Sequence, residues 1–97
     1  MAIKMIVELQ ATPGRRDELS SLLERIIATE GPSQHGFLGS TRYEVLEDRD
    51  VLVEIAAWES AHARDVHMQQ AAATGAYAPR LELLAARVRA RVISRLP

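Results

Sequence analysis

The sequence contains no cysteine. It can therefore form no disulfide bond, no thiolate nucleophile and no cysteine-liganded zinc site, and it suits a reducing cytosol. It also contains no P-loop, GxGxxG or GxSxG motif, so neither nucleotide binding nor serine hydrolase chemistry has support from a motif.

Neither sign of charge dominates, because the sequence has 12 lysine and arginine residues and 13 aspartate and glutamate residues. This balance excludes the strongly basic surface of a general nucleic-acid or anionic-membrane binder. The stretch VLVEIAAW also lacks the basic, aromatic-rich pattern with which RNA-recognition folds stack bases. No segment reaches transmembrane length, and MAIKMIVELQ is too short and too interrupted for a signal peptide. We therefore expect a cytoplasmic protein with a small neutral or weakly ionised ligand.

A chain of 97 residues predicts one domain, residues 1–97, that buries roughly 65% of its unfolded surface. Its core is thin. Such a domain is often helped by a partner subunit that covers an exposed sheet face, so we expect a homodimer.

The first half of the chain predicts a strand followed by a helix. IKMIVELQA alternates apolar and polar residues, as a half-buried strand does. In TPGRRDELSSLLERIIATEGP, Thr12 suits a helix cap and Pro13 the first helical position, and leucines and isoleucines then recur at spacings of three and four. Gly31 and Pro32 are expected to end this helix.

GFLGSTRYEVLEDRDVLVEIAAW predicts a hairpin around the charged turn EDRD. A three-residue turn places Tyr43 on one sheet face with Val53. It places Arg42 on the other face with Glu54 and Trp58. A two-residue turn inverts this pattern.

Ser60 is expected to cap a second helix over 61–73, and Gly75 with Pro79 marks a break after it. RVRARVISRL then alternates valine and alanine with arginine, which predicts a last strand. The order strand, helix, strand, strand, helix, strand is that of an α+β ferredoxin-like split βαβ sandwich with an antiparallel sheet. Helices would cover one sheet face only, leaving the other for water or a second subunit.

Several polar groups invite a functional reading. His62 and His67 lie five residues apart, about 140° around a helix, and His35 lies in a loop, so we expect no metal site. The arginines of the last strand could bind an anion, but alternate arginines more often keep an edge strand soluble. Trp58 could be a core aromatic or a pocket wall. His67 could be an idle surface histidine or the base that deprotonates a phenol.

The stretch WESAHARDVH resembles a motif of the antibiotic biosynthesis monooxygenase family, in which a tryptophan ends the third strand and a histidine follows nine positions later. TPGRRDELSSLL is similar to that family's first-helix entry, and GFLGSTRYEV to its second strand. The acidic residue that the family often carries two positions before the tryptophan is Ala56 here, with Glu54 two positions further back.

The resemblance implies a dimeric α/β barrel, in which the sheets of two subunits face each other and each subunit keeps a cavity between sheet and helices. Characterised members oxidise phenols or quinols with molecular oxygen and no metal, flavin or haem, so no cofactor is expected. Mapped by position, Trp58 would line the cavity, His67 would act as a base or orienting group, and Tyr43 would contact the substrate. Further substrate contacts are expected from Phe37, Arg42, His62 and Tyr77.

A haem-degrading branch of the same superfamily combines an asparagine with a tryptophan and a histidine. This sequence contains no asparagine, which disfavours haem degradation. The leading hypothesis is therefore a cofactor-independent monooxygenase acting on a small phenolic, quinol or polyketide-type aromatic. The alternatives are a non-catalytic dimeric module for ligand binding or stress response, and an isomerase or cyclase that needs the same base but no oxygen.

Overall fold

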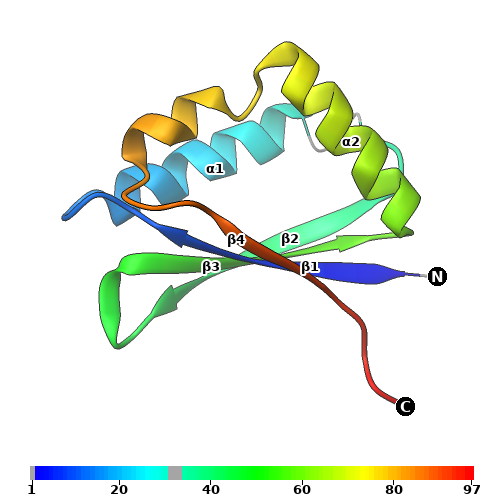
Figure 1. The fold of residues 1–97 in the computed structure, drawn as a ribbon, viewed down its shortest axis with the longest axis horizontal. Coiled ribbons are helices and arrows are strands. Elements are labelled where there is room, and N and C mark those ends of the chain that lie inside the picture. The colour runs from blue at the N-terminus through cyan, green and yellow to red at the C-terminus, as the bar shows by residue number, and fades with distance from the viewer. Residues whose placement is uncertain (1, 31–33) are drawn as a thin grey trace.

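The fold consists of one four-stranded antiparallel sheet with both helices packed on the same face (Figure 1). A computed structural model describes residues 2–30 and 34–97. The strand order is β2-β3-β1-β4, which confirms the predicted α+β ferredoxin-like arrangement. The elements are β1 (Ile3–Gln10), α1 (Arg16–Glu30), β2 (Phe37–Val45), β3 (Asp48–Trp58), α2 (Ala61–Thr74), the 3-10 helix η2 (Ala78–Leu83) and β4 (Arg89–Ile93).

The hairpin of β2 and β3 has the face pattern predicted for the longer turn. Tyr43 pairs with Val53, and Arg42 pairs with Glu54. Only two residues separate the strands, but the register shifts beside the turn, and this irregularity preserves the pattern. Glu54 and Trp58 therefore project to the sheet face that the helices cover, while Tyr43 projects to the opposite face.

Two groups of buried side chains fill the space between sheet and helices. The larger group consists of Leu9, Ala11, Leu19, Leu23, Leu52 and Leu83. The smaller group consists of Met5, Ala56 and Trp58, with Phe37 and Ala63 packed against it. The first group joins α1 and η2 to the sheet, and the second lies under α2. A candidate site lies where the two groups meet.

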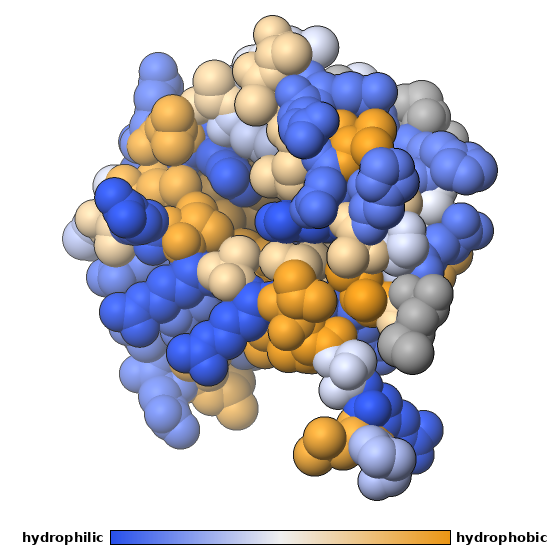
Figure 2. All heavy atoms as spheres, turned by 45° about the vertical axis from the view of Figure 1, so that its right-hand side comes forward, coloured by the Kyte–Doolittle hydropathy of each residue, from blue (hydrophilic) through white to orange (hydrophobic). Residues whose placement is uncertain are grey.

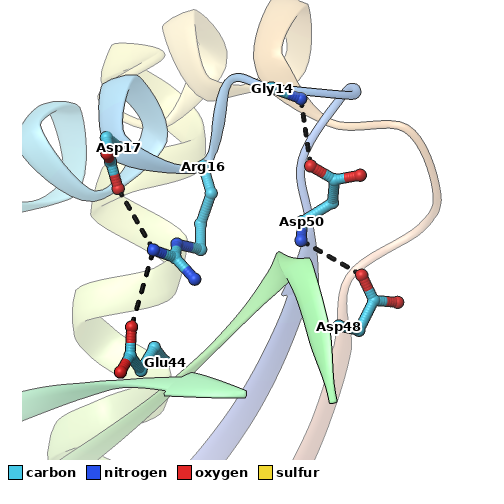
Figure 3. A network of polar contacts seen from close by, with 6 residues as sticks. All are labelled: Gly14, Arg16, Asp17, Glu44, Asp48 and Asp50. Atoms are coloured by element: carbon cyan, nitrogen blue, oxygen red, sulfur yellow. Dashed lines mark hydrogen bonds and ion pairs between the residues drawn. The ribbon is translucent and has the colours of Figure 1, made fainter. Parts of the chain in front are cut away.

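The start of α1 differs from the prediction. The helix begins at Arg16, not at Pro13, because the preceding residues are bound to other parts of the fold. The backbone N–H of Ala11 donates to the carbonyl of Asp50 at 2.7 Å, and the N–H of Gly14 donates to the Asp50 carboxylate at 3.0 Å (Figure 3). Thr12 donates its backbone N–H to Leu83. These contacts hold 11–14 as a turn beside the hairpin.

The start and end signals of α2 are confirmed. The Ser60 side chain accepts a hydrogen bond from the N–H of Ala63 at 3.1 Å, and Gly75 adopts the left-handed conformation that ends the helix. The expected stop of α1 at Gly31 and Pro32 lies outside the described residues. Within the described ranges, no helix is both long and apolar enough to cross a membrane.

Candidate active site

A cavity of about 100 Å³ lies between the sheet and the helices, where the two buried groups meet. Its floor comes from all four strands, and its roof comes from α1, α2, η2 and Tyr77, which precedes η2. Most of its lining is apolar, with a few polar side chains from different elements. The lining residues that matter below are Phe37, Glu54, Ala56, Trp58, Arg64, His67, Tyr77 and Arg80.

Trp58 is both a core residue and a wall of this cavity. Its side chain is only 5% exposed. The ring centroid of Phe37 lies 5.1 Å away on one side, and that of His67 lies 5.0 Å away on the other. These separations fall within the range for favourable ring contacts. Trp58 is therefore a core aromatic residue and a pocket wall at once, so both interpretations of the sequence apply.

His67 is buried in the middle of α2 and is held by a tyrosine. Its Nε2 atom lies 2.7 Å from the hydroxyl oxygen of Tyr77, and either atom donates according to the histidine tautomer. The two rings meet edge to face, with centroids 5.8 Å apart. A histidine and a tyrosine in this contact can pass a proton between a bound molecule and the protein.

Arg80 lies next to Tyr77 and also lines the cavity. Its guanidinium carbon lies 4.7 Å from the centre of the Tyr77 ring, as in a cation–π contact. Burial lowers the pKa of Arg80, whereas the Tyr77 hydroxyl and the Glu54 carboxylate both act to raise it. Arg80 therefore brings a poorly hydrated positive charge to the cavity.

Glu54 brings the opposite charge. Its side chain is 16% exposed and lies 3.8 Å from the Arg42 guanidinium, which also faces Glu24 at 3.7 Å. Burial raises the pKa of Glu54, and the charges of Arg42 and Arg80 counteract this rise only in part. A carboxyl group with a raised pKa inside a cavity is a candidate for proton transfer.

Four of the predicted site residues, Phe37, Trp58, His67 and Tyr77, come together at the cavity. Tyr43 does not, because it projects from the opposite sheet face and is 51% exposed. Tyr43 therefore does not line this cavity within one chain, and its predicted contact with a substrate stays a prediction. Arg42 lies behind Glu54, outside the cavity lining. His62 lines a second hollow together with His35, and His67 reaches that hollow as well.

The residues missed from the sequence are chiefly Glu54 and Arg80. The alternation of β3 carried a signal for Glu54, since it is four residues before Trp58 and so shares its face. Arg80 carried no such signal. It belongs to a short 3-10 helix whose placement over the sheet depends on tertiary packing.

A larger but open hollow of about 440 Å³ lies at the hairpin end of the molecule. Arg16 there faces Glu44 at 3.6 Å and Asp17 at 3.4 Å, and the carboxylate of Asp48 accepts the N–H of Asp50 (Figure 3). These charged groups pair with one another, and no aromatic ring lines the hollow. We therefore interpret this network of polar contacts as structural. Nowhere in residues 2–30 and 34–97 do three histidine or carboxylate side chains gather to hold a metal ion.

Comparisons with known proteins extend these observations. The family model for antibiotic biosynthesis monooxygenases matches residues 2–78. A solved structure from Mycobacterium tuberculosis is 25% identical, with a TM-score of 0.80, over 100% of this chain and 97% of that one. A conserved protein from Methanosarcina mazei is 19% identical, with a TM-score of 0.82, over 99% of this chain and 94% of that one.

SnoaB, a cofactor-independent oxygenase from Streptomyces nogalater whose mutant has been solved, is 17% identical, with a TM-score of 0.81. The alignment covers 97% of this chain and 92% of that chain. At such identities the Methanosarcina and Streptomyces structures establish a shared fold only. A search of curated proteins finds no match.

Proposed function

The chain belongs to the antibiotic biosynthesis monooxygenase family, and from that premise we propose that it oxidises a small phenolic or quinol-type aromatic with molecular oxygen. The observation that carries this proposal is the contact of His67 Nε2 with the Tyr77 hydroxyl, beside Trp58 in a mostly apolar cavity. The indole gives an aromatic guest a surface to stack on, and the imidazole gives its hydroxyl a base.

In this proposal the substrate supplies the electrons, so the reaction needs no metal, flavin or haem. Removal of a hydroxyl proton leaves an electron-rich phenolate that can give electrons to oxygen. One oxygen atom then forms a bond to a ring carbon, and the other leaves as water. In this way a naphthalene diol and O₂ yield a hydroxyquinone and H₂O. The residues of the chain bind the ring, take the proton and exclude bulk water.

The size of the cavity favours a small guest. Its volume of about 100 Å³ is well below the roughly 300 Å³ at which drug-sized ligand pockets begin. A single aromatic ring needs little rearrangement. Two or three fused rings require α2 and η2 to move away from the sheet, so we propose that single-ring phenols bind with less structural change than tricyclic ones.

We also propose that residues 1–97 act as one cytoplasmic domain that forms a homodimer through the uncovered sheet face. Ile6, Val53 and Ile55 lie side by side on that face and are only partly buried. On the side of the molecule drawn in Figure 2, apolar side chains gather near the middle, between charged side chains. Pairing of two such faces would remove them from water. Light scattering at micromolar concentration should give a dimeric mass, and a monomeric mass would contradict this assembly.

Oxygen uptake on addition of a hydroxylated naphthalene or an anthrone tests the reaction. We expect uptake by the wild type and about a 10²-fold lower turnover for His67→Ala. His35→Ala is the matched control, because His35 is exposed and lies outside the cavity. A protein that binds the aromatic but consumes no oxygen would be a binding module, an isomerase or a cyclase.

A further inference from the structure

Two buried polar atoms of the cavity lack hydrogen-bond partners. These atoms are Oε2 of Glu54 and Nε of Arg80, and the statement holds for the part of the chain that the structure describes. Both side chains line the same cavity and each senses the charge of the other. The separation of 3.8 Å between Glu54 and Arg42 is too long for a hydrogen bond. Leaving such atoms unsatisfied costs free energy, so the pair is suited to a bound polar group.

The two atoms need hydrogen-bond partners of opposite kinds. The Glu54 carboxylate oxygen can only accept a hydrogen bond, and the Arg80 Nε–H group can only donate one. A phenolic hydroxyl is at once one donor and one acceptor. A hydroxyl group on an aromatic guest therefore has the hydrogen-bonding character that each of these side chains needs in a partner.

We propose that Glu54 is a second catalytic base of this site and that Arg80 holds the oxyanion produced there. This role rests on the function proposed above. The O–H bond of the substrate hydroxyl breaks, its proton forms an O–H bond with the Glu54 carboxylate, and the electron pair stays on the phenolate oxygen. That oxygen then accepts a charge-assisted hydrogen bond from Arg80 Nε–H.

The placement of Glu54 on β3 fits this role. Glu54, Ala56 and Trp58 are alternate residues of one strand and share a face, so the first and last lie about 13 Å apart along the strand. The small side chain of Ala56 leaves room between them. A ring lying over Ala56 has the indole and the His67–Tyr77 pair at one end and the carboxylate at the other. A quinol carries two hydroxyls, so each base can serve one.

The charges around Glu54 come from every layer of the fold. Arg42 faces it from β2 and Arg80 from η2, while Arg64 and His67 reach the cavity from α2. The carboxylate of Glu24 on α1 pairs with Arg42 and balances its charge. Burial keeps the pKa of Glu54 above its ordinary value despite the neighbouring arginines. A carboxylate that is more basic than usual is a better acceptor for a phenolic proton.

Turnover of Glu54→Gln and Glu54→Asp tests the catalytic role. We expect Glu54→Gln to lower kcat about 10²-fold with little change in KM, because the amide keeps the shape but takes no proton. Glu54→Asp should retain part of the activity, since it keeps the carboxylate. Glu24→Gln is the matched control: it also removes a carboxylate beside Arg42, but its side chain is 73% exposed. Wild-type kcat in folded Glu54→Gln would overturn the proposal.

A binding measurement separates this role from the oxygen chemistry. Calorimetric titration with 4-nitrophenol in buffers of different ionisation enthalpy, at a pH where the phenol is ionised, reports protons taken up on binding. The wild type should take up close to one proton per ligand, onto Glu54, and Glu54→Gln should take up none. Arg80→Met should bind at least about tenfold more weakly, whereas the exposed control Arg87→Met should not.

The two tests fail independently. A protein that shows the Glu54-dependent proton uptake but consumes no oxygen retains the carboxylate base and loses the monooxygenase function. Equal proton uptake in the wild type and Glu54→Gln, or no binding of 4-nitrophenol by the wild type, would overturn the role of Glu54 even if oxygen is consumed.

Discussion

The Nε2 atom of His67 lies 2.7 Å from the hydroxyl oxygen of Tyr77, although ten residues separate the two in the sequence. This contact joins the buried middle of α2 to the segment that enters η2. It fixes the imidazole in a cavity whose next wall is Trp58, with ring centroids 5.0 Å apart. The site is thus a connected row of aromatic rings that ends in charged groups.

Removal of the tyrosine hydroxyl should loosen the histidine. We expect Tyr77→Phe to lower turnover about tenfold or more and to cost about 1 kcal/mol of stability, because one partly buried hydrogen bond is lost. Steady-state kinetics and urea unfolding measure the two effects. Tyr43→Phe, which removes a hydroxyl from the opposite sheet face, should leave turnover at the wild-type value. An equal loss in both variants would disprove the specific role of Tyr77.

Trp58 should dominate the stability of the smaller buried group. Trp58→Ala removes an indole that packs against Phe37, Met5 and Ala56, so it should cost about 3–5 kcal/mol in the free energy of unfolding. Trp58→Phe keeps an aromatic surface and should cost clearly less. Chemical denaturation of both variants tests this, and a loss below about 1 kcal/mol for Trp58→Ala would show that the indole is not packed as described.

Glu54 makes the stability depend on pH in a defined direction. Its pKa in the folded chain lies above the ordinary value of 4.5, so the folded state holds more protons than the unfolded state between these two values. Stability should therefore fall as pH rises through this window. Glu54→Gln lacks the carboxyl group, so its melting temperature relative to wild type should be higher at neutral pH than at pH 4.5. A difference that does not change with pH would contradict the raised pKa.

Gly36 sets the approach of α2 to the start of β2. Its φ is +85°, and a Cβ atom there would lie 2.6 Å from the Cβ of Ala63. Gly36→Ala should therefore displace Phe37 and the start of α2, lowering both the melting temperature and the affinity for aromatic ligands. Gly14→Ala is the control, because it has a similar φ of +78° but no neighbour within 4 Å. Equal effects of the two variants would show that backbone strain alone is responsible.

The sequence was most informative where local chemistry decides the structure. Alternation predicted β1 and the last strand, and the Ser60 and Gly75 signals predicted α2. The Thr12 and Pro13 signal was misleading, because long-range hydrogen bonds to Asp50 and Leu83 hold that segment as a turn. Local propensity cannot foresee such contacts.

The site could be predicted only in part, because several of its contacts also join residues that are distant in the sequence. Spacing linked Trp58 to His67 through the family resemblance, and both line the cavity. The position of Tyr43 depended on the register of the hairpin, which two turn lengths left open, and the shift beside the turn placed it on the far face. Arg80 lines the same cavity as Glu54 only because η2 folds back over the sheet. Partners of this kind are set by tertiary structure.

The most direct test of the account is the fate of molecular oxygen labelled with ¹⁸O during turnover of a hydroxylated naphthalene. We expect mass spectrometry to find one labelled atom in the quinone product, with the second in water, and the rate to depend on His67 but not on His35. Product that carries no label, or the same rate for His67→Ala as for the wild type, would contradict the claim that this cavity oxidises aromatics with molecular oxygen.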